Sequence, residues 1–169
     1  MNLVFDLLDN TMDRNGFACG EAALDRYLQA YALQDMRKNF ATVVVARQQD
    51  LPQTIVGYYT LATASVTSAH IPDDLGRKMP KYPTVPAIRI GRLAVATPFQ
   101  GRHVGSMLLL NALKRACRSD IAWAIFVVDA KNSDVAEFYR KFQFETLKSS
   151  PLSLFLTRAL AEKIRQSLD

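Results

Sequence analysis

The chain has 169 residues, of which 49% are hydrophobic and 22% are charged. That length and composition fit one globular domain, and they exclude a disordered chain, a collagen-like chain and a small disulfide-stapled protein. The longest apolar runs, such as Ile121 to Val128, are far shorter than the ~20 residues that cross a bilayer, so no membrane segment is expected. The first ten residues lack the basic start of a signal peptide, which indicates a cytoplasmic protein whose Cys19 and Cys117 are reduced, buried thiols.

The charge is unevenly distributed along the chain. The total of +5 hides a window from Asp74 to Asp120 that has no acid between its ends. The window contains nine bases, namely Arg77, Lys78, Lys81, Arg89, Arg92, Arg102, Lys114, Arg115 and Arg118. The rest of the chain sets twelve bases against sixteen acids, a net −4. This pattern favours a polyanionic partner, and a merely solvated basic surface is the alternative.

The first half of the chain predicts a strand, a helix and a hairpin. Leu3 to Leu8 is the expected first strand. From Ala22 to Met36, apolar residues recur at spacings of three and four and predict a helix with one buried stripe: Ala23, Leu24, Tyr27, Leu28, Tyr31 and Ala32. Thr42 to Ala46 and Ile55 to Thr67 are β-branched or aromatic and predict a hairpin. Adjacent Tyr58 and Tyr59 should face opposite sides of the sheet, as core and cleft wall.

A proline-rich loop and a strand with a change of phase follow. Four of the seven prolines lie between about Ser68 and Ala87, and a loop of that length is usually functional. In the next strand, Ile88 to Val95, residues 88 and 90 share one phase whereas Leu93 and Val95 share the other. A slip at Gly91 and Arg92 predicts a β-bulge, unless the glycine only admits a neighbouring side chain.

The last part predicts alternating helices and strands. A helix is expected from Val104 to Arg118, and a second, from Asp134 to Phe142, should be capped by Ser133 or Asp134. Further elements are strands at Trp123 to Val128, from Phe144 and at Leu152 to Leu156, and a terminal helix at Ala159 to Leu168. The chain therefore predicts an α/β (α+β) fold, with residues 1–169 forming a single domain around a mixed, twisted sheet.

The turn Gln100-Gly101-Arg102-His103-Val104-Gly105 joins the phase-shifted strand to the first of these helices. A helix N-terminus directs unpaired backbone N–H groups and a partial positive charge at one spot, which favours phosphate. The turn also lies inside the acid-free window. Together these features predict an anion site.

This turn resembles the signature of the GNAT superfamily of acetyl-CoA-dependent N-acetyltransferases, Gln/Arg-x-x-Gly-x-Gly/Ala. Gln100 and Gly105 match it, and His103 stands where the first motif glycine is usual. The resemblance implies a GNAT-type domain with helices on both sheet faces, a bulged central strand, and acetyl-CoA as acetyl donor. It assigns the pantetheine arm to Leu93, Ala94 and Val95. It also implies that the pyrophosphate contacts the turn, and that Asn132 contacts the cofactor as well. The residues of the turn are Gln100, Gly101, Arg102, His103, Val104, Gly105 and Ser106.

Residues 15 to 156 are similar to the tRNA-acetylating toxins of bacterial toxin-antitoxin modules. The similar segments are Phe17-x-Cys19-Gly20 with Leu24-Asp25, Gly57-Tyr58-Tyr59-Thr60-Leu61, Gly91-Arg92-Leu93-Ala94-Val95, Val128-Asp129-Ala130 and Phe138-Tyr139. A departure is Gln143-Phe144, where the family usually has Gly-Phe. The resemblance implies acetylation of the α-amine of aminoacyl-tRNA, which blocks translation, a ribbon-helix-helix antitoxin, and a homodimer. The bases Arg77, Lys78, Lys81, Arg89 and Arg92 would then face tRNA.

Acetyl transfer from a thioester to an amine requires no protein nucleophile. The reference pKa of an α-amine, ~8, leaves part of it neutral at pH 7, so direct transfer without a strong base is expected. The resemblance places Tyr139 beside the CoA sulfur, where a phenol can act as general acid. No Cys, His or Asp cluster has the spacing of metal ligands, so no metal is expected.

Two other functions are compatible with the sequence. A GNAT enzyme could acetylate a small amine or a protein N-terminus, because CoA is itself a polyanion. A nonenzymatic module could bind nucleic acid or CoA. Basic residues away from the cofactor turn would favour the toxin over an enzyme that acetylates small amines or protein N-termini. Tyr139 beside the sulfur would favour either enzyme over a nonenzymatic binding module.

Overall fold

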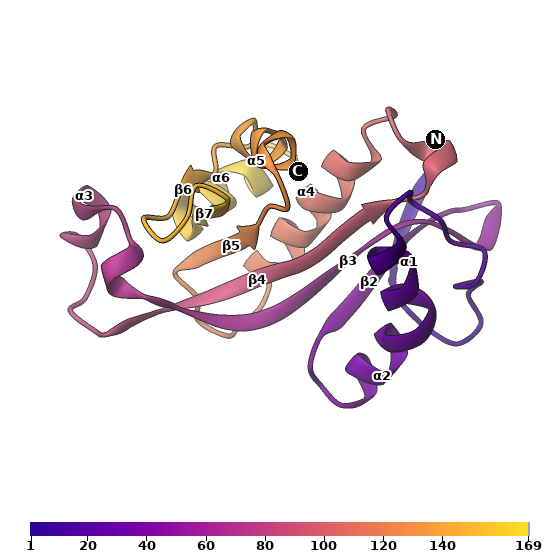
Figure 1. The fold of residues 1–169 in the computed structure, drawn as a ribbon, viewed down its shortest axis with the longest axis horizontal. Helices are drawn as coiled ribbons and strands as arrows, with labels where there is room; N and C mark the ends of the chain where they lie inside the picture. Colours follow the sequence, from indigo (N-terminus) through magenta and orange to yellow (C-terminus); the bar gives the residue numbers. More distant parts are fainter. Residues whose placement is uncertain (169) are drawn as a thin grey trace. The chain divides into compact units, whose positions relative to one another are not determined.

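The computed structural model describes residues 1–168. Its strands form a seven-stranded sheet of order β1-β2-β3-β4-β5-β7-β6, which confirms the predicted α/β class (Figure 1). The strands are β1 (Leu3–Leu7), β2 (Thr42–Gln48), β3 (Leu51–Thr67), β4 (Thr84–Val95), β5 (Ile125–Asp129), β6 (Glu145–Thr146) and β7 (Ser153–Thr157). The helices are α1 (Ala22–Arg26), η1 (Tyr27–Tyr31), α2 (Ala32–Arg37), η2 (Ser68–His70), α3 (Asp73–Gly76), η3 (Thr97–Phe99), α4 (Val104–Cys117), α5 (Ser133–Arg140) and α6 (Arg158–Gln166). None of these helices is long and apolar enough to cross a membrane.

The contacts group the chain into two compact units. The first unit comprises Met1–Ala62 with Ile90–Ala112, and the second comprises Thr63–Arg89 with the chain from Leu113 onward. Each unit combines segments that are distant in sequence.

In the first unit, β1, β2 and β3 pair antiparallel, so the predicted strand and hairpin are confirmed. Tyr58 and Tyr59 do face opposite sides of β3. The Tyr58 hydroxyl donates to the Leu24 carbonyl of α1 at 2.7 Å, and the Tyr59 hydroxyl donates to Asn111 Oδ1 of α4 at 2.7 Å. Helices therefore cover both faces of the sheet in this unit, as predicted. Neither tyrosine walls a cleft, because both are 0% exposed.

The predicted helix from Ala22 to Met36 is present, but its buried stripe shifts. A π-helical turn, η1, occupies Tyr27–Tyr31, and the backbone N–H of Ala32 donates to the Tyr27 carbonyl. A π turn adds one residue to the helical repeat, so the core-facing position five residues after Tyr27 is Ala32, which is fully buried. Tyr31 is 45% exposed, and Ala23 is exposed as well, so the stripe was wrong at these two positions.

A glycine lets β3 approach its neighbours in the same unit. Gly57 has no room for a side chain, because a Cβ would lie 2.9 Å from the Ala94 carbonyl oxygen and 2.9 Å from Leu108 Cδ1. The pairing of β2 with β3 also shifts register between Ala46 and Arg47. The end of β4 and the start of α4 are thus held close to β3.

Strand β4 begins at Thr84, four residues before the predicted start at Ile88. Its first residues are extended even though they include Pro86. The buried phase runs through Ile88, Ile90 and Ala94, while Leu93 and Val95 are half-buried. Burial therefore keeps its phase across Gly91 and Arg92. Adjacent Ala87 and Ile88 are both buried, and the β-bulge predicted at Gly91 and Arg92 stays a prediction.

In the second unit, β7 pairs antiparallel with β5 and with β6. Fully buried Phe126 and Phe155 lie on the paired strands β5 and β7. Phe126 and Phe144 approach with ring centroids 6.3 Å apart, and Tyr139 of α5 lies 5.4 Å from Phe144. Tyr139 of α5 therefore forms part of this core.

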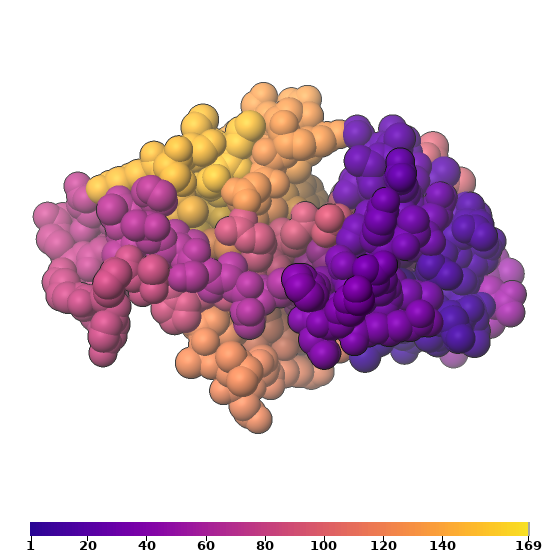
Figure 2. All heavy atoms as spheres, turned by 60° about the horizontal axis from the view of Figure 1, so that its bottom comes forward, coloured from indigo at the N-terminus to yellow at the C-terminus, as the bar shows by residue number. Residues whose placement is uncertain are grey.

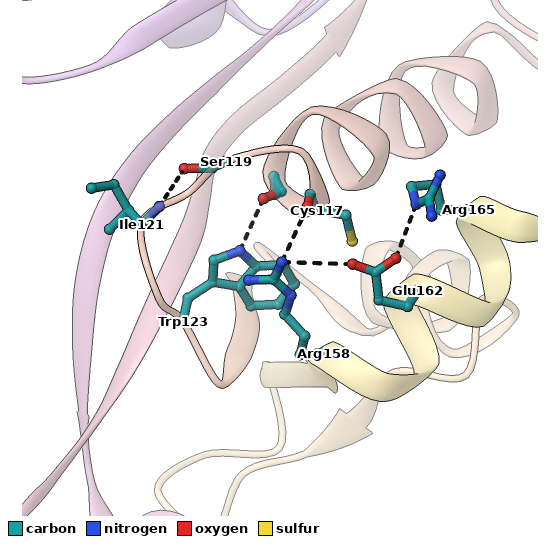
Figure 3. Close-up of polar contacts among 8 residues, drawn as sticks. Cys117, Ser119, Ile121, Trp123, Arg158, Glu162 and Arg165 are labelled. Carbon is teal, nitrogen blue, oxygen red and sulfur yellow. Dashed lines mark hydrogen bonds and ion pairs between the residues drawn. The ribbon is translucent and has the colours of Figure 1, made fainter.

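The C-terminal end of α4 is fixed to α6 by a polar cluster (Figure 3). Trp123 Nε1 donates to the Ala116 carbonyl at 3.0 Å, and Arg158 Nη2 donates to the Cys117 carbonyl at 3.1 Å. The Arg158 guanidinium also lies over the Trp123 ring, 4.7 Å from its centroid. Glu162 pairs with Arg158 at 3.6 Å. These bonds satisfy the last carbonyls of α4, which have no partner within the helix.

The proline-rich segment between β3 and β4 is partly ordered into η2 and α3. Its residues, in magenta, form a lobe at the left of the space-filling view (Figure 2). The Lys148 backbone N–H donates to the His70 carbonyl at 2.8 Å, and Lys148 forms an ion pair with Asp73. The segment is therefore anchored to the chain that leads into β7.

Candidate functional site

The turn between β4 and α4 has the geometry of an anion site. Gly101 and His103 both have left-handed backbones, with φ of 74° and 61°. The Met107 N–H donates to the His103 carbonyl at 3.1 Å, so the helix begins directly after His103. The N–H groups of Val104, Gly105 and Ser106 lie in the first turn, where helix geometry provides no acceptor. His103 thus occupies a conformation that favours glycine, which is the residue usual at this motif position.

Gln100 has a role that the sequence did not reveal. Its side-chain Nε2 donates to the Cys19 carbonyl at 2.8 Å and to the Val95 carbonyl at 2.9 Å. Both amide N–H donors are used in these bonds, so the side chain ties the turn to two other carbonyls of the same unit. The predicted contact of Gln100 with the pyrophosphate stays a prediction. The Thr97 N–H, which donates to the Ala18 carbonyl at 2.9 Å, adds a second tie to the same loop.

The predicted pantetheine strand lies beside this tie. Leu93 and Val95 are half-buried and Ala94 is buried. The Val95 carbonyl is occupied by Gln100, and the Ala96 N–H donates to the Val56 carbonyl at 2.8 Å. The backbone at the end of β4 is therefore fixed before any ligand binds.

Tyr139 is a buried tyrosine of α5. The residue is 4% exposed and packs against Phe138 at 5.0 Å and Phe144 at 5.4 Å between ring centroids. Burial raises the pKa of the Tyr139 phenol above its ordinary value of 10.0, which keeps it in the protonated form. Within residues 1–168 no group forms a hydrogen bond with this hydroxyl, which is therefore free to donate to a ligand.

Asn132 caps α5. Its Oδ1 accepts from the Val135 N–H at 2.9 Å, and its backbone is extended, as N-cap geometry requires. The cap is therefore Asn132, and the prediction of Ser133 or Asp134 was wrong. This bond occupies Oδ1, while the side-chain amide remains on the surface.

Arg92 is stacked on an aromatic ring. Its guanidinium carbon lies 3.5 Å from the Tyr27 ring centroid, a cation–π contact. The Tyr27 hydroxyl donates to Asp35 Oδ2 at 2.9 Å, and burial together with this bond raises the pKa of Tyr27 to about 12. Arg92 is thus held in place by the first unit rather than projecting freely.

Arg89 is paired with an acid outside the window. It forms an ion pair with Asp129, whose other carboxylate oxygen accepts from Ser153 Oγ at 2.8 Å. This pair borders a cavity of ≈ 250 Å³ that His70 and Ser149 also line. The fold therefore places an acid from outside the acid-free window beside Arg89.

Arg77, Lys78 and Lys81 follow α3 and are exposed. Among the residues that the structure describes, no carboxylate forms an ion pair with any of the three. Arg77 and Lys81 line a cavity of ≈ 420 Å³. These three exposed cations can therefore contact an anionic partner.

The first unit brings together residues 92–106, whereas the second contains Arg77, Lys78, Lys81, Arg89, Asn132 and Tyr139.

Cys19 and Cys117 are free thiols and buried, as predicted. Burial raises the pKa of each thiol to about 11, which makes both poor nucleophiles at neutral pH. Within residues 1–168 no three His, Cys, Asp or Glu side chains gather as a metal site would require.

Comparison with known proteins gives a consistent result. The family profile described as "Acetyltransferase (GNAT) domain" matches residues 39–146. A tRNA-acetylating toxin of Mycobacterium tuberculosis (strain ATCC 25618 / H37Rv) is 35% identical over 146 residues, which is 85% of each chain. The fold is similar to that of AtaT complexed with acetyl-methionyl-tRNAfMet, with a TM-score of 0.87, 24% identity, and coverage of 99% of this chain and 100% of that one. A mutant AtaT toxin bound to the C-terminus of the antitoxin AtaR and acetyl-CoA has a TM-score of 0.80 and 20% identity, with coverage of 98% and 99%.

Proposed function

The chain belongs to the acetyltransferase (GNAT) family, and on that premise we propose that it acetylates the α-amine of aminoacyl-tRNA and so blocks translation. The observation that carries this proposal is the 35% identity, over 85% of the chain, to a protein named as a tRNA-acetylating toxin. The exposed cations Arg77, Lys78 and Lys81 support a nucleic-acid substrate. They distinguish it from a small amine, which would need no such surface.

Acetyl-CoA supplies the acetyl group as an activated thioester. The first-turn N–H groups of α4, at Val104, Gly105 and Ser106, fit its pyrophosphate, because they combine unpaired donors with the helix dipole. The fixed backbone at Leu93, Ala94 and Val95 is suited to pair with the pantetheine arm. Gln100 holds these two segments together through its bonds to the Cys19 and Val95 carbonyls. Gly101, Arg102 and His103 complete the exposed rim of the turn.

In the proposed reaction, the neutral α-amine forms the new C–N bond to the acetyl carbon as the C–S bond breaks. Tyr139 donates its hydroxyl proton toward the departing sulfur, and the net proton passes from the amine to the thiol. The raised pKa of Tyr139 keeps this donor protonated. A covalent acetyl-cysteine route is disfavoured, because both thiols are buried and have raised pKa values.

The proposal extends to assembly and location. One solved relative carries the C-terminus of an antitoxin, and on this support we assign the present chain an antitoxin partner with a ribbon-helix-helix DNA-binding domain. We further propose that residues 1–169 act as one acetyltransferase domain, that two copies form a homodimer, and that the protein works in the cytoplasm, where its substrate occurs. The family match from 39 to 146 includes segments of both units, which supports a single functional domain.

The test offers labelled acetyl-CoA with four matched acceptors: an aminoacyl-tRNA, the same tRNA deacylated, the free amino acid, and a peptide with a free N-terminus. Label should enter only the aminoacyl-tRNA and be recovered as N-acetyl amino acid after mild alkaline hydrolysis. Equal transfer to the free amino acid or to the peptide would establish the small-amine or N-terminal activity instead.

A charge-reversal series tests the tRNA surface in the same assay. The triple variant Arg77→Glu, Lys78→Glu and Lys81→Glu should lose tRNA acetylation and keep acetyl-CoA affinity, and each lost phosphate contact should flatten the logarithmic salt slope by roughly one unit. The control is Arg37→Glu, Lys38→Glu and Lys163→Glu, which changes the net charge equally at exposed positions. Equal activity of the two triple variants would remove this segment from the tRNA site.

A further inference from the structure

In the second unit, the segment that connects β3 to β4 forms a cavity together with Lys148. It has a volume of ≈ 420 Å³ and is lined by Ser68, Ala69, Ile71, Asp73, Gly76, Arg77, Met79, Pro80, Lys81, Tyr82, Val85 and Lys148. This volume falls in the range of ~300–1,000 Å³ found for small-ligand pockets. Its lining mixes apolar side chains with cations. Figure 2 shows the segment that forms it at the surface of the unit.

Tyr82 presents an aromatic ring that the fold itself does not use. The residue is 70% exposed. Its backbone is nonetheless fixed: the Ser68 hydroxyl donates to the Tyr82 carbonyl, and the Tyr82 N–H donates to the Pro80 carbonyl at 3.0 Å. The Ser68 N–H adds a bond to the Pro83 carbonyl at 3.0 Å. An exposed ring on a fixed backbone is a preformed stacking platform, because little conformational entropy is lost when a ligand covers it.

The charge around this ring is positive. Arg77 and Lys81 line the cavity, and no carboxylate of the described chain forms an ion pair with either. The one acid in the lining, Asp73, is neutralised by its ion pair with Lys148, which lowers the pKa of that carboxyl. The cavity therefore offers two available cations beside an aromatic face.

Building on the proposed function, we propose that this cavity holds an unpaired nucleotide of the single-stranded 3′ end of tRNA. The base would stack on the Tyr82 ring, and the adjacent phosphates would contact Arg77 and Lys81. Interleaved aromatic rings and cations are the chemistry by which proteins hold single strands, since every base has a π face and every linkage a negative charge. An acidic peptide would satisfy the cations but would leave the Tyr82 ring without a planar partner.

The test measures equilibrium binding of deacylated tRNA with its 3′-terminal CCA, and of the same tRNA trimmed of CCA. For the intact tRNA, Tyr82→Ala should raise Kd by about 5- to 100-fold, the effect expected from loss of one base–aromatic stack. Tyr82→Trp should bind as wild type does. For the trimmed tRNA, Tyr82→Ala and wild type should bind equally, because the stacking partner is absent in both. Lys81→Gln should flatten the logarithmic salt slope by ~0.7, the value for one phosphate of a single strand.

Phe40→Ala is the matched control, because Phe40 is 76% exposed in the first unit and should leave both affinities unchanged. An unchanged Kd for Tyr82→Ala on intact tRNA, or an equal loss on trimmed tRNA, would overturn the assignment. Competition by polyglutamate as effective as that by a CCA oligonucleotide would overturn it in favour of an acidic peptide. Because deacylated tRNA cannot be acetylated, failure of this experiment leaves the proposed activity standing, and failure of the acetyl-transfer assay leaves the binding result standing.

Discussion

Removing the Gln100 side chain tests whether this residue positions the cofactor turn or contacts the cofactor. In Gln100→Ala, the carbonyls of Cys19 and Val95 both lose a donor, from bonds of 2.8 Å and 2.9 Å. One hydrogen bond contributes a net of ~0.5–1.5 kcal/mol, so the free energy of unfolding should fall by about 1–3 kcal/mol. At about 2–4 °C per kcal/mol for a chain of this size, the Tm should fall by roughly 2–12 °C.

Affinity for acetyl-CoA should fall less than tenfold in the same variant, because the proposed phosphate donors are backbone N–H groups of α4. Gln100→Glu should be less stable than Gln100→Ala, since it directs a carboxylate at two carbonyl oxygens. Arg102→Ala is the control, an exposed neighbour in the same turn whose loss should leave the Tm unchanged. The assays are differential scanning calorimetry and isothermal titration calorimetry. A native Tm for Gln100→Ala with a large loss of affinity would refute the positioning role and return Gln100 to the cofactor.

Three further predictions concern the turn and the buried tyrosines. Gly105→Glu should abolish acetyl-CoA binding and leave a native circular dichroism spectrum, because it puts a negative charge at the N-terminus of α4; unchanged affinity by calorimetry would exclude this turn as the phosphate site. His103→Gly should leave the free energy of unfolding within about 0.5 kcal/mol, since relief of the left-handed backbone (φ 61°) is offset by the entropy that glycine adds to the unfolded chain. A tenfold loss of cofactor affinity in His103→Gly would show that the imidazole itself contacts the ligand. Burial raises the pKa of Tyr58 and Tyr139 above 10.0, so the folded state holds these two protons more tightly than the unfolded chain does. Their contribution to stability should therefore be lost only as the pH rises above about 10. A spectrophotometric titration in which both phenols of the folded protein ionise at their ordinary pKa would contradict this.

Local patterns were sufficient to predict most elements of the fold. Alternation and turn residues located the hairpin of β2 and β3, and Thr97, Pro98 and the glycines after them placed the start of α4 at Val104. Spacing within the helix could not reveal the π turn at Tyr27–Tyr31, because its extra residue changes the repeat without a sequence signal as strong as proline or glycine. That is why Tyr31 was assigned to the core.

The contacts at the site that the sequence could not predict have a common cause, which is pairing between residues far apart in sequence. Gln100 bonds to the carbonyl of Cys19, 81 positions away, and Arg89 pairs with Asp129, 40 positions away. A motif identifies which residues lie at the turn, but it does not show which side chains the fold itself uses. Asn132 is a partial exception, since Asn is a good N-cap residue and its position directly before Ser133 could have identified it.

The most direct test of the central claim is single-turnover acetyl transfer by Tyr139→Phe. Enzyme saturated with labelled acetyl-CoA is mixed with aminoacyl-tRNA, and the rate at which N-acetyl-aminoacyl-tRNA forms is compared with that of wild type. We predict that wild type acetylates this substrate and that Tyr139→Phe, with native Tm and acetyl-CoA affinity, is slower by about 10²- to 10⁴-fold, the scale of losing a general acid. Wild-type failure to acetylate aminoacyl-tRNA, or an equal rate for Tyr139→Phe, would contradict it.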